Sequence, residues 1–150
     1  MRGQWACDAV SSGTWRITRR ISAGSHLVRE LKQYYRVKGS QLRQYSKLTD
    51  DAGVIMLSYP FEAGRAWRTV NEGNWMEYKV DSVGERITVK AGSFPGCLKI
   101  GERNLAYPNS IKYNYYAPEV GWVLTTTALV GGSEHRSTEL LSCKVFPEAQ

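Results

Sequence analysis

Two histidines and three cysteines are the residues of this chain best suited to nucleophilic chemistry. His26 and His135 each lie beside a turn signal, and either could pair with Cys97 in a cysteine–histidine site. The sequence contains no Gly-x-Ser-x-Gly nucleophile elbow. Free cysteines are often buried as small apolar side chains, so the pattern favours two surface histidines and a structural Cys97.

Metal ligands would have to cluster, and the sequence offers little clustering. Cys7, Cys97 and Cys143 form no Cys-x-x-Cys pair, and their odd number leaves at least one thiol free or bonded to another chain. Asp50 and Asp51 are the only adjacent acidic residues and are typical of a hairpin turn. We therefore expect no metal site, no cofactor and no catalytic residues. An enzyme with dispersed carboxylates stays an alternative, because paired distant carboxylates leave no local signature.

The net charge of +6 could suit nucleic acid or an anionic surface. Arg16, Arg19 and Arg20 form the only tight basic cluster, and the other basic residues are scattered. This dispersal favours a soluble domain with a modest basic excess and argues against nucleic acid as the partner. A nucleic-acid-binding β domain that uses this cluster and nearby aromatic residues is kept as a second alternative.

No run of about eighteen apolar residues occurs, so the sequence predicts no transmembrane helix. Residues 1–10 lack the basic-then-apolar order of a signal peptide. Three interpretations of this start stay open: a cytoplasmic protein, a chain numbered after a removed leader, or a start internal to a longer frame.

Turn signals, among them residues 82–84 (SVG) and 94–96 (FPG), recur along the chain with β-rich runs between them, which is typical of an antiparallel sheet or barrel. Within residues 14–21, Trp15 and Ile17 alternate with Arg16 and Thr18, as in a half-buried strand. Similar alternation occurs over residues 75–80, 87–89 and 111–115.

Residues 27–37 can be read in two ways. Leu27, Leu31 and Tyr34 lie at helical spacing, but the adjacent tyrosines and Val37 favour a strand. About ten strands result, and an open flat sheet of that size tends to curl or close. The sequence thus predicts a single all-β domain over residues 14–146, a strongly curved antiparallel sheet or incomplete barrel. Residues 1–13 would form a separate N-terminal segment and residues 147–150 a tail.

Aromatic residues on the predicted strands are expected mainly to fill the core, with Trp67 and Trp122 as anchors. Phe61, Phe94 and residues 42–48 are available to plug the concave side of the sheet. If they leave an apolar groove, it would be the default ligand site. The predicted ligand-binding residues are Trp15, Tyr35, Met76, Tyr78, Tyr113 and Tyr115.

Three segments resemble a domain of bacterial envelope and lipoprotein-type proteins of unknown function. The matching stretches are residues 57–67 (LSYPFEAGRAW), 89–100 (VKAGSFPGCLKI) and 115–123 (YYAPEVGWV). They are similar to "hydrophobic-Pro-Leu-x-x-Gly-x-x-Trp", "Val-Pro-Ala-Gly-Thr-Phe-x-x-Cys-Leu-x-Val" and "Tyr-Tyr-Ala-Pro-Gly-Val-Gly-Leu-Val". Lys90 stands where this family usually has Pro, and Glu119 where it often has Gly.

The resemblance covers roughly residues 14–144 and implies an antiparallel sheet in an exported, periplasmic or lipid-anchored setting. It implies no known activity. Taken with the residue patterns, it predicts a non-enzymatic envelope-type module that binds a partner protein or an apolar ligand on the concave sheet face. The alternatives are the enzyme with a dispersed carboxylate or Cys/His site and the nucleic-acid-binding β domain.

Overall fold

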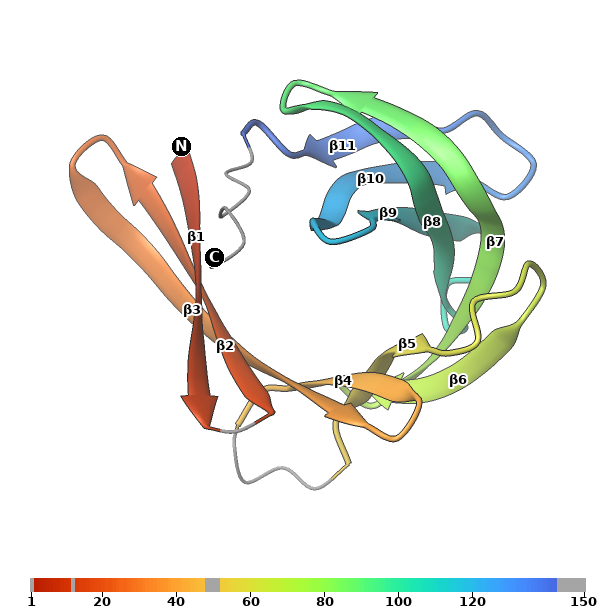
Figure 1. Cartoon of the computed structure of the whole chain (residues 1–150), viewed down its shortest axis with the longest axis horizontal. Coiled ribbons are helices and arrows are strands. Elements are labelled where there is room, and N and C mark those ends of the chain that lie inside the picture. The colour runs from red at the N-terminus through yellow and green to blue at the C-terminus, as the bar shows by residue number, and fades with distance from the viewer. Residues whose placement is uncertain (1, 12, 48–51, 143–150) are drawn as a thin grey trace, which may run out of the picture. The chain divides into compact units, whose positions relative to one another are not determined.

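The computed structural model describes residues 2–11, 13–47 and 52–142, and its regular structure is entirely β (Figure 1). These residues form eleven strands, all paired antiparallel, which confirms the predicted all-β antiparallel class. Within the same ranges there is no helix that could cross a membrane. The strands are β1 (Arg2–Ser11), β2 (Thr14–Ala23), β3 (His26–Lys38), β4 (Gln41–Tyr45), β5 (Val54–Ser58), β6 (Ala66–Asn71), β7 (Asn74–Val89), β8 (Gly92–Asn104), β9 (Ser110–Ala117), β10 (Gly121–Leu129) and β11 (His135–Glu139).

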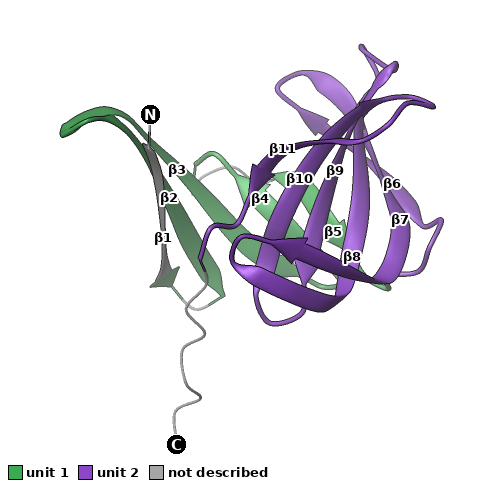
Figure 2. Cartoon of the chain, turned by 90° about the horizontal axis from the view of Figure 1, so that it is seen from above, with its two compact units in different colours: residues 1–60 green, residues 61–150 purple. Residues whose placement is uncertain are grey.

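The strands form two sheets, each of which follows the chain as a meander. The first has the order β1-β2-β3-β4-β5 and the second β11-β10-β9-β8-β7-β6, and neither closes into a barrel over the described strands. The chain divides into two compact units, residues 1–60 and 61–150 (Figure 2). The predicted single domain is not confirmed by this division, and the strong curvature stays a prediction.

One face of the second sheet buries an alternating row of side chains from β7. Met76, Tyr78 and Val80 share this face, as their spacing predicted. Val80 is paired with Ile100 of β8, and Leu98 lies two residues before Ile100 on the same face. All five side chains are buried, so this face forms an apolar layer.

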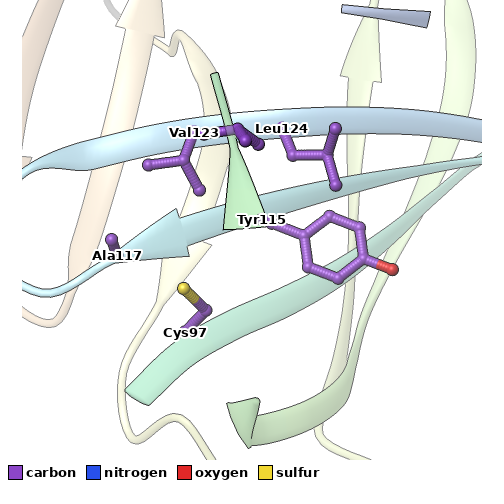
Figure 3. Close-up of a cluster of buried hydrophobic side chains, with 6 residues drawn as sticks. Cys97, Tyr115, Ala117, Val123 and Leu124 are labelled. Carbon is purple, nitrogen blue, oxygen red and sulfur yellow. The ribbon is translucent and has the colours of Figure 1, made fainter. Parts of the chain in front are cut away.

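The other face of the second sheet buries a separate cluster. Cys97 lies here, together with Tyr115, Ala117, Val123 and Leu124 (Figure 3). Alternation along β8 places Leu98, the next residue, on the opposite side of the sheet. Phe94 is partly buried and packs against this cluster. The buried members are Val89, Cys97, Tyr115, Ala117, Val123 and Leu124.

Two predicted turns of the second unit are wrong. Residues 82–84 lie inside β7, which continues without interruption to Val89, and residues 94–96 lie inside β8. The register with β8 shifts three times along this stretch, and Gly84 adopts a φ of 96°. The glycine therefore marks a bulge that bends a continuous strand, rather than the end of one.

Side chains of the first sheet alternate between its two faces as predicted, but on β2 the buried side chains are polar and the aromatic one is exposed. Residues 27–37 form part of strand β3, so the helical alternative is wrong. On β2, Thr14 and Thr18 are buried, whereas Trp15 on the opposite face is exposed. The Arg36 guanidinium donates from Nε to Thr14 Oγ1 at 2.9 Å, which shows how a long basic side chain covers a small polar one.

Tyr45 is the only buried hydrophobic side chain among the described residues of the first unit, with 2% of its surface exposed. The Arg36 guanidinium and the Lys38 ammonium lie 5.3 and 6.0 Å from its ring centroid. Gly53 approaches the ring so closely that a Cβ there would lie 2.8 Å from Tyr45 Cε1. Residues 48–51, with the predicted Asp50–Asp51 turn and the end of the 42–48 plug, lie outside the described residues.

Candidate functional site

The first sheet carries an apolar patch on the face opposite Thr14 and Tyr45. Trp15 and Tyr35 are register partners on β2 and β3, and Val37 is the partner of Leu42 on β4. Trp15 is 43% exposed and Val37 is 61% exposed. We call this group the Trp15 patch. It consists of Trp15, Ile17, Tyr35, Val37 and Leu42, which alternation places on one face.

Polar neighbours hold the Tyr35 ring in place on this patch. Its hydroxyl donates to Gln33 Oε1 at 3.4 Å and accepts from Gln44 Nε2 at 3.1 Å. The first contact lies within β3, and the second joins β3 to β4. An aromatic side chain fixed before contact loses less conformational entropy when a partner covers it.

The structure distributes the six predicted ligand residues over three sheet faces, two on each. Trp15 and Tyr35 belong to the Trp15 patch. Met76 and Tyr78 are buried in the apolar layer of β7. Tyr113 and Tyr115 lie on β9, on the opposite face of the second sheet. The first pair therefore offers the open aromatic surface.

A polar network surrounds Lys99, which is 9% exposed in the middle of β8. Its ammonium lies 2.8 Å from Glu134 Oε2 and 3.3 Å from Asp81 Oδ2. The same nitrogen lies 4.3 Å from the Tyr113 ring centroid and 5.5 Å from that of Tyr115. Two carboxylates and two rings thus compensate this buried cation.

Glu134 is fully engaged as a hydrogen-bond acceptor. Its Oε1 accepts from the Tyr115 hydroxyl and from Thr126 Oγ1, each at 2.6 Å, while Oε2 accepts from Lys99. Burial alone would raise the pKa of Glu134, but these three hydrogen bonds lower it overall. Burial, aided by Glu134, raises the pKa of Tyr115 to about 12.

The Lys99 network is a feature that the sequence analysis missed. Burial acts to lower the pKa of Lys99, but the hydrogen bond to Glu134 reverses that effect and the pKa is raised. The signal was a lysine between Leu98 and Ile100, inside an apolar run. Because its groups satisfy one another, the network has the character of a structural clamp between β8 and the segment that carries Glu134.

Cys97 is fully buried and free, in agreement with the expected structural role. Its thiol donates to the Phe94 carbonyl oxygen at 3.3 Å, and burial raises its pKa, which disfavours the thiolate. His26 and His135 are exposed, as expected. No group of three or more potential metal ligands occurs in the described part of the chain. The Cys7 side chain and Cys143 lie outside that part.

No family model matches the chain, and no curated protein or solved structure matches it either. The resemblance to envelope domains therefore stays a prediction. Residues 89–100 cover the β7–β8 turn and the first part of β8, and residues 115–123 cover the β9–β10 turn. Residues 57–67 contain the boundary between the two units, and Trp67 lies on β6 at one edge of the second sheet.

Proposed function

We propose that this protein is a non-enzymatic binding module that contacts its partner through the Trp15 patch. The observation that carries the proposal is the exposure of Trp15 and Val37 on one sheet face, beside the fixed ring of Tyr35. Exposed apolar groups gathered on one face mark interaction sites more often than scattered ones do. Trp15 and Tyr35, two of the six predicted ligand-binding residues, therefore belong to the proposed site. This site does not depend on a strongly curved sheet.

A partner protein is favoured over a small apolar ligand. The patch lies on the face of a sheet, and Trp and Tyr are the side chains that most often anchor protein–protein interfaces. The bacterial envelope setting is part of the proposal and rests on the three sequence motifs alone.

An enzyme has weaker support. Lys99 and Glu134 have perturbed surroundings, but their hydrogen-bonding capacity is used within the network. The pKa of the Cys97 thiol is raised rather than lowered, which is the wrong direction for a nucleophile.

Two matched tryptophan variants test the proposal. Trp15→Ala removes the centre of the patch, while Trp75→Ala removes a tryptophan of the second unit that is 58% exposed. A bacterial envelope extract is passed over immobilised wild type and over each variant, and retained proteins are identified by mass spectrometry. We expect a protein that wild type and Trp75→Ala retain and Trp15→Ala loses.

Fluorescence of the dye ANS, measured with the same proteins, reports on the alternative ligand. If Trp15→Ala binds less dye than wild type and no protein is selectively retained, the result would favour an apolar ligand over a partner protein. If Trp15→Ala behaves as wild type in both assays, the Trp15 patch is not the binding surface.

A further inference from the structure

The net charge of the protein is concentrated in one of its two units. Residues 1–60 contain ten Lys and Arg against four Asp and Glu, whereas residues 61–150 contain ten of each. The whole excess of +6 therefore belongs to the first unit. Even if all four of its carboxylates were paired, six cations would remain in excess within that unit.

Strand register gathers many of these cations on one face of the first sheet. Thr14 faces Arg36, and Arg36 faces Arg43 on the next strand. Because side chains alternate along a strand, this face is the one opposite the Trp15 patch. We call it the basic face, and its cations are Arg16, Arg20, Lys32, Arg36, Lys38 and Arg43.

Two guanidinium groups of the basic face are fixed by neutral partners. Arg36 donates to Thr14 Oγ1 and lies over the Tyr45 ring. Arg43 donates to Gln41 Oε1 at 3.0 and 2.6 Å and to the Ala52 carbonyl oxygen at 2.6 Å. Neutral partners orient these groups without cancelling their charge, so the face is preorganised for an anion.

Among the described side chains of this face, Glu30 is the one acid. It lies 2.8 Å from Arg20 Nε and 3.6 Å from Lys32 Nζ. The hydrogen bond from Arg20, with weaker contributions from both cations, lowers the pKa of Glu30 despite a small opposing effect of burial. Among the described side chains, one carboxylate against six cations leaves a net excess of five positive charges on this face.

We propose that the basic face binds the phosphate backbone of single-stranded nucleic acid. Arg36 and Lys38 lie two residues apart on β3, a spacing of ~6.8 Å, and Arg43 is the partner of Arg36 on β4, so these three cations occupy adjacent positions of the face. Four of the six are arginines, whose planar fork fits phosphate oxygens. Tyr34 lies on the same face, as the partner of Arg16, and offers a ring on which a base can stack.

An anionic membrane is the less favoured partner. Interfacial binding gains strength when apolar and basic side chains reach the lipid together. Here the exposed side chains of Trp15 and Val37 lie on the opposite face, in the Trp15 patch. The proposal is thus independent of the proposed function, because it concerns the other face.

Fluorescence anisotropy of a labelled oligothymidylate, roughly 16 nucleotides long to span one single-strand site, tests the proposal. We expect binding that weakens with salt, since each phosphate contact contributes about 0.7 to the logarithmic salt slope. A titration with vesicles containing phosphatidylglycerol is run in parallel.

Two double variants remove the same charge from opposite faces of the sheet. Lys32→Gln with Lys38→Gln changes the basic face, and Arg19→Gln with Arg29→Gln changes the other face. All four side chains are exposed, so we expect both variants to fold, as circular dichroism will verify. The first variant should reduce the salt slope by about 1.4, the value for two lost contacts, and the second should leave it almost unchanged.

Three outcomes would overturn the proposal. The first is no binding of the oligonucleotide by wild type at low salt. The second is an equal loss in both double variants, which would indicate diffuse attraction without a basic-face site. The third is binding to the anionic vesicles but not to the oligonucleotide, which would make a lipid surface the partner.

Discussion

The two sheets of this protein share an antiparallel meander and differ in what surrounds their strands. Of the thirteen buried hydrophobic side chains among the described residues, the second unit holds twelve and the first holds only Tyr45. The first unit instead carries the whole net charge. Alternation and pairing thus specify strands in both units, whereas only the second unit combines them with an extensive apolar core.

The two units also differ in how exposed their ion pairs are. In the second unit, the Lys99 side chain is only 11% exposed and its partner Glu134 is 31% exposed. In the first unit, Arg20 and Glu30 form a more exposed pair on the surface. Buried pairs lose much stability when one partner is removed, and exposed pairs lose little.

The largest effect is expected from truncating equivalent isoleucines in the two units. Ile100 is 1% exposed, so Ile100→Ala should lower the free energy of unfolding by about 2–5 kcal/mol. Ile17 is half-buried, so Ile17→Ala should lower it by only about 1 kcal/mol. Urea denaturation followed by tryptophan fluorescence measures both. Equal losses would remove the contrast in core packing.

A glycine pair tests whether Tyr45 is the anchor of the first unit. Gly53 and Gly24 both have positive φ, 63° and 61°, but only Gly53 is crowded, by Tyr45 and the Gln44 carbonyl. Gly24→Ala should therefore lose about 1 kcal/mol through backbone strain alone. Gly53→Ala should lose roughly 2–4 kcal/mol because overpacking is added.

The glycine comparison is measured by thermal unfolding of both variants. A Gly53→Ala variant as stable as Gly24→Ala would mean that the Tyr45 ring moves freely and anchors nothing.

The clamp at Glu134 predicts a specific pH dependence. The pKa of Glu134 is lowered below its ordinary value of 4.5, so its contribution is complete above that pH. The contribution is lost as the pH falls through the lowered pKa. Glu134→Gln should cost roughly 2 kcal/mol at neutral pH, and the difference from wild type should shrink in acid.

Glu62→Gln, an equal change of charge at an exposed position, is the control for this clamp. It should leave stability close to wild type at every pH. A Glu134→Gln deficit that persists unchanged at pH values well below 4.5 would contradict the electrostatic origin of the clamp.

The smallest expected effect is a gain in stability. Glu119 has a φ of 63° in the β9–β10 turn. Glu119→Gly should raise stability by about 0.5 kcal/mol, because glycine adopts this φ without side-chain strain. Lys79→Gly, within a strand, should instead lower it by roughly 0.5–1 kcal/mol. Thermal midpoints of both variants check the opposite signs.

Much of the strand pattern was predictable from local sequence. The row Met76, Tyr78 and Val80 alternates with polar residues and lies on one buried face, as expected. Gly84 misled the prediction, because a glycine signals equally well a turn that ends a strand and a bulge inside one. Only the pairing of β7 with β8 distinguishes these two cases.

The candidate sites were less predictable, because they depend on which strands become neighbours. Trp15 and Tyr35 were both predicted to contact ligand, but their adjacency follows from the β2–β3 register. The charges seemed dispersed along the chain because Arg36 and Arg43 are far from Arg16 in sequence. Pairing places them on one face, and no local window of sequence contains that information.

The central claim, that the second unit is core-stabilised and the first is not, is tested most directly by amide hydrogen exchange. Strands β2 and β8 make a matched comparison, since each lies between two neighbouring strands of its sheet. Local opening is easier where few apolar contacts must be broken. We therefore expect β8 amides to exchange about a hundredfold more slowly than those of β2, which corresponds to ~2.8 kcal/mol. Equal protection of the two strands would contradict the claim.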